Sequence, residues 1–261
     1  MRFKLFVIGL LLLLAPGSQA RQNRPDRSVD DDTGGKQLIA PVFTQSDPLA
    51  SYLSITEVSG RYVGVTVQEY RENGRESYRE SHLIARDALS VHNTHHSSTG
   101  PFTDNGWAKI TVPDFADVYA VNTTWDRTRP GLYVESQVVE PANAFRLFAR
   151  LTEEGETGIA IVNPTDAAQS VTVTFYEHEP ESGRVSNRTW EIEAQSKLSR
   201  FLREWVPLGG NPPRNTISPE PIRFSGVVRV QGETVIAVGA LWFSRETEWF
   251  SSVIVTTEPL R

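Results

Sequence analysis

The sequence predicts an all-β protein whose folded part is two tandem antiparallel β-sandwich domains, at residues 37–141 and 142–261. Three observations lead to this prediction. Segments rich in Val, Ile, Thr, Tyr and Phe alternate with turn residues at spacings of about 8–12 residues. Sustained helical periodicity is absent. The apolar segments of the first half also recur, in order, in the second half.

Two pairs of segments illustrate the internal repeat. Residues 65–70 (VTVQEY) match residues 171–176 (VTVTFY), 106 positions later. Residues 118–125 match residues 235–242 at an offset of 117, and each of these segments ends on a tryptophan. Loops tolerate changes of length that packed strands do not, so a duplicated β-domain is expected to keep its strands while the offset drifts.

The first 20 residues read as a signal peptide. Arg2 and Lys4 form a positive n-region, residues 5–15 are apolar, and residues 18–20 (SQA) place small residues before a cleavage point. The apolar run is shorter than the ~20 residues that span a bilayer. Residues 21–36 are polar, charged and without periodicity, which predicts a short disordered linker. We therefore expect an exported protein, periplasmic or extracellular, with no membrane insertion of the mature chain.

Composition restricts the possible partners. The chain has no cysteine, whereas exported eukaryotic domains usually carry disulfides, so a bacterial protein is favoured. The formal net charge is −6, and loss of Arg2 and Lys4 with the signal peptide makes it −8. An acidic chain without a basic cluster argues against nucleic acid or an anionic membrane as the partner.

The pattern predicts eight strands in each half. In the first half they are residues 38–43, 52–57, 62–70, 77–84, 89–92, 107–112, 117–125 and 132–139. In the second half they are residues 145–151, 158–163, 170–177, 189–194, 197–201, 225–230, 235–243 and 250–256. The dipeptide Asn73-Gly74 predicts a tight hairpin, and residues 198–205 fit one or two helical turns. A two-sheet sandwich fits this strand density, and an up-and-down barrel is the alternative.

The second half resembles modules of secreted and surface-anchored bacterial proteins. The resemblance rests on residues 157–164 (TGIAIVNP), the strand VTVTFYE, residues 200–202 (RFL), FSGVVRV at 224–230 and IAVGAL at 236–241. It implies an immunoglobulin-like or fibronectin-like sandwich, often found in tandem, and no established activity. The first half departs from it, with Thr56-Glu57-Val58 where the second has Val162-Asn163-Pro164.

A histidine-rich segment is the sharpest polar cluster. His92, His95 and His96 fall within residues 91–96, at a spacing that would ligate zinc or copper if a carboxylate approached. The second half has no histidine in the corresponding segment. We therefore favour a solvated loop without metal, and no cofactor is predicted.

The six tryptophans divide into two groups. Trp125 and Trp242 end the repeated segments, so we expect both in the cores. The other four are not duplicated, and exposed members of this group would be possible ligand contacts that stack on sugar rings: Trp107, Trp190, Trp205 and Trp249. Ordinary partial burial is the alternative for each of them.

These patterns favour an exported, non-catalytic binding or structural module. No nucleophile elbow, zinc-protease motif or phosphate loop occurs, so we expect no enzyme. The partner would be a protein or glycan at the cell surface, contacted through strand edges or through long loops at residues 93–105 and 205–222. Carbohydrate binding by exposed Trp and Tyr is the alternative. A hydrolase with two carboxylates at the domain junction is less favoured.

Overall fold

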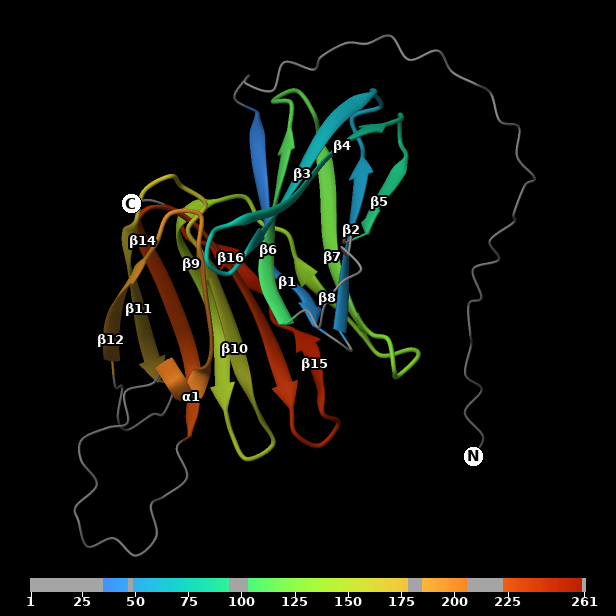
Figure 1. The fold of residues 1–261 in the computed structure, drawn as a ribbon. Helices are drawn as coiled ribbons and strands as arrows, with labels where there is room; N and C mark the ends of the chain where they lie inside the picture. Colours follow the sequence, from blue (N-terminus) through green and yellow to red (C-terminus); the bar gives the residue numbers. More distant parts are fainter. Residues whose placement is uncertain (1–34, 47–48, 94–102, 178–184, 206–222, 260–261) are drawn as a thin grey trace, which may run out of the picture. The chain divides into compact units, whose positions relative to one another are not determined.

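The computed structural model describes residues 35–46, 49–93, 103–177, 185–205 and 223–259, all within one compact unit, Gly34–Arg261. Two antiparallel sheets of eight strands each make up this unit (Figure 1). The predicted all-β class is therefore confirmed. Among the described residues, no helix is long and apolar enough to cross a membrane.

The first eight strands form the N-terminal sheet. They are β1 (Lys36–Ser46), β2 (Leu49–Glu57), β3 (Val63–Arg71), β4 (Glu76–Ile84), β5 (Leu89–Asn93), β6 (Thr103–Val112), β7 (Val118–Asp126) and β8 (Tyr133–Gln137). Their order is β4-β3-β6-β1-β2-β7-β8, and β5 pairs with β2. Strand β1 pairs with β2 only at Gln45–Ala50 and Ser46–Leu49, so the sheet divides there into two layers.

The remaining strands form the C-terminal sheet. They are β9 (Ala142–Leu151), β10 (Gly155–Val162), β11 (Gln169–Glu177), β12 (Val185–Ile192), β13 (Lys197–Phe201), β14 (Phe224–Ser244), β15 (Trp249–Ser252) and β16 (Val255–Thr257). The helical turn α1 (Leu202–Trp205) follows β13, where the sequence predicted it. The two strands predicted between residues 225 and 243 are one long strand, with a register shift between Gln231 and Ile236.

The two sheets share one pairing scheme. The first half of β14 pairs with β9 and β11, and its second half pairs with β10 and β15. Counted as two halves, β14 takes the places that β6 and β7 hold in the N-terminal sheet, and β13 pairs with β10 as β5 pairs with β2. The repeat seen in the sequence is therefore also a repeat of strand pairing.

The pairing corrects one part of the sequence alignment. Ile55 pairs with Ala120, and its repeat partner Ile161 pairs with Val238, so this segment is offset by 118 and not by 117. A slip of one residue moves every side chain to the opposite face of a strand. Trp125 and Trp242 therefore do not occupy equivalent positions.

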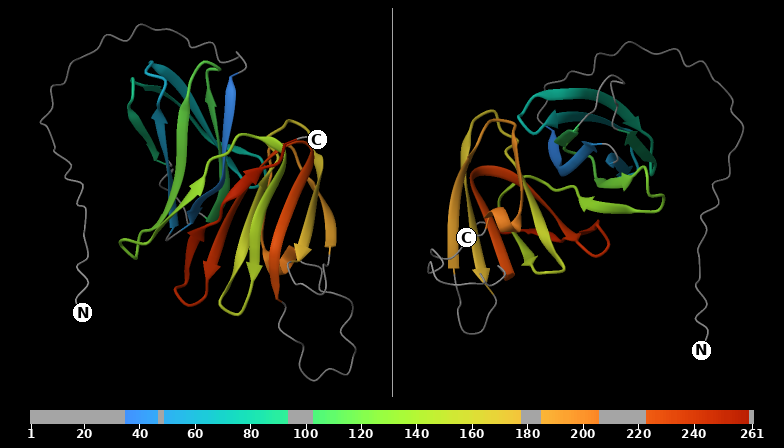
Figure 2. Two further views of the ribbon diagram at one scale, coloured as in Figure 1. Left: turned by 180° about the vertical axis from the view of Figure 1, so that it is seen from behind. Right: turned by 60° about the horizontal axis from the view of Figure 1, so that its bottom comes forward.

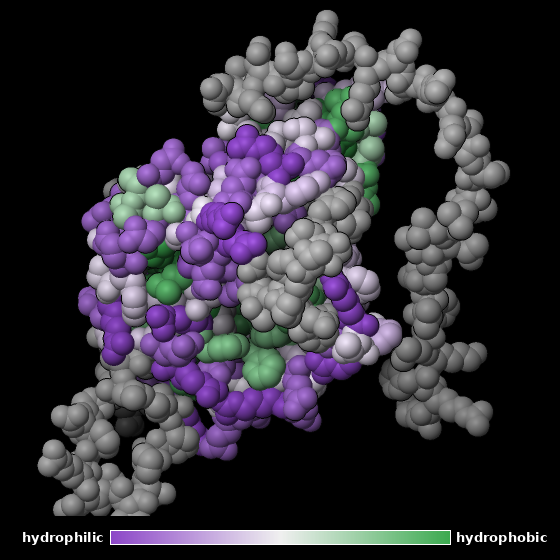
Figure 3. Space-filling model, viewed as in Figure 1, coloured by the Kyte–Doolittle hydropathy of each residue, from purple (hydrophilic) through white to green (hydrophobic). Residues whose placement is uncertain are grey.

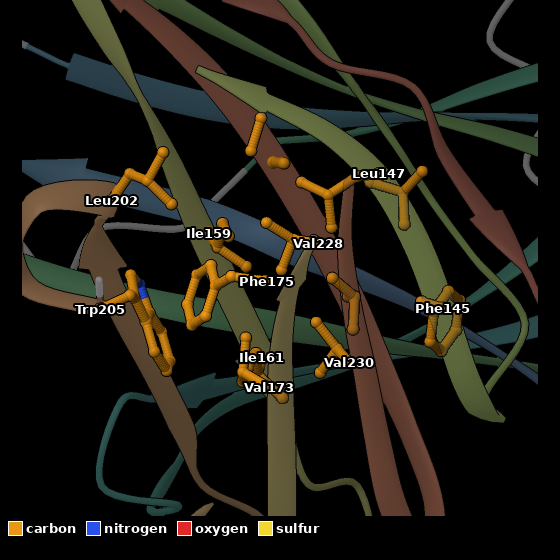
Figure 4. Packing of buried hydrophobic residues seen from close by; sticks show 14 of the residues in the cluster. Phe145, Leu147, Ile159, Ile161, Val173, Phe175, Leu202, Trp205, Val228 and Val230 are labelled. Carbon is orange, nitrogen blue, oxygen red and sulfur yellow. The ribbon is translucent and has the colours of Figure 1, made fainter. Parts of the chain in front are cut away.

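Each sheet is curved (Figure 2), and each encloses an apolar cluster. Alternate residues of each strand face inward, as in the burial of Val171, Val173 and Phe175 on β11. Figure 4 shows Val173 and Phe175 meeting side chains of β9, β10 and β14, with Leu202 and Trp205 of α1 closing one end. A separate apolar cluster fills the N-terminal sheet.

A third apolar cluster joins the two sheets. Trp107 of β6 is fully buried and stacks on Tyr70 of β3, with ring centroids 4.3 Å apart. Both rings pack in a cluster with Val162 and Ala237 of the C-terminal sheet. The indole N–H of Trp107 donates to the backbone oxygen of Gln195 over 3.1 Å. The sheets are therefore held together by packing and by directed hydrogen bonds.

The β3–β4 hairpin provides another contact between the sheets. Its turn residue Gly74 has φ of +82°, as expected for the Asn-Gly sequence. A Cβ at Gly74 would lie 2.7 Å from the backbone oxygen of Ala194 and 3.0 Å from that of Gln195. Glycine is thus required both by the turn and by the neighbouring sheet.

We expect Gly74→Ala to lower the free energy of unfolding by about 2–3 kcal/mol, because it adds a clash to the strain of positive φ. The matched control is Gly60→Ala, since Gly60 has φ of +73° and no atom within 4 Å of the added Cβ. That variant should lose only about 1 kcal/mol. Urea unfolding measures the free energy of unfolding of both variants. Equal losses would show that Gly74 does not pack closely against the C-terminal sheet.

Candidate functional site

A pocket of about 470 Å³ lies between the two sheets and is the candidate functional site. The N-terminal sheet contributes Val42, Leu49, Asn105, Thr124 and Val134 to its wall. The C-terminal sheet contributes residues of β10, β13, α1, β14 and β15, among them Phe201, Leu241 and Phe250. This volume lies in the range of roughly 300–1,000 Å³ that is typical of small-molecule sites.

Small residues hollow out the side formed by the C-terminal sheet. On β10, Gly158 pairs with Phe201 and Leu241, and Ala160 pairs with Ser199 and Gly239. At Gly239 an added Cβ would lie 3.0 Å from Val42 across the interface, so there the sheets touch. Gly158 and Ala160 line the pocket. The short side chains therefore let the two sheets touch at Gly239, and they leave space for the pocket at Gly158 and Ala160.

The corresponding face of the N-terminal sheet carries different residues. Pairing places Tyr52 at the position of Gly158, and Leu89 at the position of Lys197. Leu89 is exposed, with no sheet covering it. This face therefore lines the pocket in the C-terminal sheet, whereas in the N-terminal sheet it carries exposed side chains such as Leu89.

Lys197 is the principal polar residue of the pocket. It is 5 % exposed, and its ammonium donates to Asn105 Oδ1 and to the Gly106 backbone oxygen, each over 2.6 Å. Its backbone N–H donates to the Glu72 backbone oxygen over 2.9 Å, which fixes the residue against the hairpin of the other sheet. Burial lowers the pKa of Lys197 to about 7, and the charge of Glu72 opposes that shift.

Ser199 follows Lys197 on the same face of β13 and also lines the pocket. Its hydroxyl oxygen is buried and has no hydrogen-bond partner among the described residues. Lys197 and Ser199 form no hydrogen bond with each other, so no base is in place to activate the hydroxyl. The two side chains are arranged to contact a ligand rather than to form a nucleophile and base.

The rim of the pocket carries one pair of opposite charges. Arg200 Nη1 lies 3.7 Å from Glu204 Oε1, and both side chains are partly exposed. Glu204 also accepts the backbone N–H of Phe201 over 2.8 Å. Arg200 and Glu204 largely balance each other, whereas Lys197 has no such partner inside.

The four tryptophans predicted as ligand contacts are not exposed. Trp107 and Trp205 are fully buried, and Trp249 is 8 % exposed. Trp190 is half-buried, with its ring 4.6 Å from that of Trp205 in an edge-to-face contact. Trp107 and Trp249 bond across to the opposite sheet, so these rings join the sheets or fill the C-terminal core.

The most exposed tryptophan is Trp125, which the sequence pattern had predicted to lie in a core. Trp125 is 46 % exposed and pairs across strands with Tyr133, which is 61 % exposed. Trp242 is half-buried beneath the guanidinium of Arg150, 4.9 Å from its ring. The wrong assignment of Trp125 follows from the offset of 117, because strand faces alternate with every residue.

Other predicted features fall largely outside the described residues. His92 occupies a position in β5 opposite Leu53, while His95 and His96 lie in the segment that is not described. The described residues contain no cluster of three or more potential metal ligands. Most of both long loops, residues 94–102 and 206–222, is likewise outside the description.

Figure 3 shows a mainly hydrophilic surface on one face of the molecule, with hydrophobic side chains gathered in separate patches. The mainly apolar pocket between the sheets is therefore a more selective binding feature than this face. No family model, curated protein or solved structure matches the chain. The candidate function therefore follows from the geometry of the described residues.

Proposed function

We propose that the protein is an exported, non-catalytic binding module of two tandem immunoglobulin-like β-sandwich domains, which holds its ligand in the pocket between the two sheets. The observation that carries the proposal is the pocket itself, about 470 Å³, with apolar walls and the polar groups of Lys197 and Ser199. Such a combination of apolar lining and a few placed polar groups is typical of binding sites.

Two features support the tandem arrangement. The sheets repeat one pairing scheme, and each encloses its own apolar cluster. Export remains the expectation from residues 1–20, and a cell-surface protein or glycan remains the predicted class of partner for the surface outside the pocket. A ligand held between two domains would also fix the angle between them.

The polar groups of the pocket weigh against a hydrolase at the junction. Glu204 is the one carboxylate among the described residues that line the pocket. Glycoside hydrolysis by the usual mechanism needs two carboxylates on either side of the scissile bond. Ser199 also lacks a hydrogen-bonded base. Binding is the simpler use of this site.

We expect the full chain to bind the neutral fluorescent probe N-phenyl-1-naphthylamine, with increased emission as the probe enters the apolar pocket. Ala160→Leu fills the pocket from its floor and should abolish this signal. Ala120→Leu would not serve as a control, because Ala120 is buried in the N-terminal core and a larger side chain would disturb the packing there. Thr56→Leu, at the position in β2 that corresponds to Val162 and half-buried on the outer face, should leave binding unchanged. Unchanged emission in Ala160→Leu would contradict the proposal.

Carbohydrate binding on the outer face of the N-terminal sheet is the second candidate. The exposed pair Trp125 and Tyr133 favours it, with Tyr119 also exposed on β7. Aromatic rings on an open sheet face suit stacking on sugar rings. A glycan array with the wild type and Trp125→Ala tests it, and binding that survives this substitution would place the sugar elsewhere.

A further inference from the structure

We infer that the pocket takes a small amphipathic carboxylate, whose anionic head contacts Lys197 and Ser199 while its apolar body lies against Phe201, Leu241 and Phe250. This inference rests on the proposed function and specifies its ligand class. Three observations carry it: a buried lysine without an anionic partner among the described residues, an unpaired hydroxyl on the same face of β13, and a mainly apolar pocket wall.

The first observation is the charge balance around Lys197. Its ammonium has three N–H donors, and two of them reach neutral acceptors, Asn105 Oδ1 and the Gly106 oxygen. No described carboxylate lies within ion-pair distance, although the charge of Glu72 acts on it from further away. A buried cation is costly unless it is paired, so an incoming anion would be favoured here.

The second observation is the hydroxyl of Ser199. On an extended strand, residues two positions apart point to the same side, and both side chains line the pocket. A carboxylate accepts several hydrogen bonds through its two oxygens. One oxygen contacting Lys197 and the other contacting Ser199 would satisfy both groups at once.

The third observation concerns the rest of the ligand. Beyond the two polar groups the wall is mainly apolar, with Val42, Leu49 and Val134 on the N-terminal side. A free inorganic anion would leave this surface wet, whereas an alkyl or aryl body would cover it. Arg200 at the rim is already paired with Glu204, so the inner cation is the better anchor.

The test measures displacement of N-phenyl-1-naphthylamine from the full chain by octanoate, octanol and octylamine, which share one alkyl length. We expect octanoate to bind at least about tenfold more tightly than octanol, because a charge-assisted hydrogen bond in a mainly apolar pocket adds at least that much. Octylamine should bind most weakly. In Lys197→Met the preference for octanoate should disappear while octanol still competes.

Two further variants sharpen the result. Ser199→Ala should lower octanoate affinity several-fold and leave octanol affinity unchanged. Arg200→Gln should leave the preference for octanoate intact. If Arg200→Gln loses this preference and Lys197→Met retains it, the anion binds at the rim and the inference is overturned. Each variant is checked by circular dichroism, and the neutral probe reports whether the pocket is preserved.

The outcomes separate the two proposals. If the neutral probe and all three ligands fail to bind, the proposed function fails and the inference fails with it. If octanol and octanoate bind equally, the pocket binds ligands but the carboxylate assignment is wrong. If an apolar peptide with a free carboxyl end binds and octanoate does not, the occupant is a protein segment, and the small-ligand inference is overturned.

Discussion

Replacing Trp107 by alanine should lower the free energy of unfolding by about 3–5 kcal/mol, the range for truncating a fully buried large aromatic side chain. The ring stacks on Tyr70 and packs against Val162 and Ala237, so its loss leaves a cavity between the sheets. The Gln195 backbone oxygen would also lose its donor. Urea unfolding followed by circular dichroism measures the change.

Trp125→Ala is the matched control, because it removes the same side chain from a half-exposed site. It should cost about 1 kcal/mol or less, the usual value of a cross-strand aromatic pair at a surface. The loss of unfolding free energy in Trp107→Phe should lie between these two values, because phenylalanine keeps a ring stacked on Tyr70 but loses the hydrogen bond to Gln195. Equal costs for Trp107→Ala and Trp125→Ala would show that the interface between the sheets contributes little to stability.

Much of the strand pattern was predictable from local sequence. Strand β13 was predicted with its observed bounds, and the Asn73-Gly74 turn lies where the dipeptide indicated. Local signals suffice because period-two alternation and turn residues act over a few positions. The continuity of β14 was missed, since Gly232 in QGETV reads as a turn, whereas it lies at the register shift of one long strand.

The candidate site was not predictable, because it depends on contacts between residues far apart in the chain. Lys197 reads as an ordinary strand lysine until β6 supplies Asn105 and Gly106 as acceptors. Trp107 reads as unduplicated and free until the C-terminal sheet covers it. One signal was available: Gly158 is small where Tyr52 stands in the first half. A much smaller residue at a repeated position indicates that something lies against that face.

The same face of the repeated scaffold has a different environment in each sheet. The same face is open in the N-terminal sheet, where Leu89 and Tyr119 are exposed. In the C-terminal sheet it is covered by the other half of the molecule, and its side chains are reduced to Gly, Ala and Ser around one lysine. The same face of the repeated scaffold is thus exposed in one sheet and internal in the other, and its side chains differ accordingly.

Lys197 should make the stability of the protein increase with pH above neutrality. Its pKa is about 7 in the folded chain and 10.5 in its ordinary state, because burial disfavours the ammonium. Between these values the unfolded chain binds more protons than the folded chain, so the free energy of unfolding rises with pH. This contribution is fully present above about pH 10.5 and is lost as pH falls to about 7. The slope is at most about 1.4 kcal/mol per pH unit.

Lys197→Met removes the titrating group, so its unfolding free energy should rise less with pH than that of the wild type. Between about pH 7.5 and 9.5 the free energy of unfolding of the wild type should rise by about 2–3 kcal/mol more than that of Lys197→Met. Urea unfolding at fixed ionic strength measures both. Lys197→Arg is the second control, because a guanidinium stays protonated throughout this range. It should be less stable than wild type, with no such slope. Parallel curves for wild type and Lys197→Met would show that Lys197 has the same pKa in the folded and the unfolded chain, so that burial does not disfavour its ammonium.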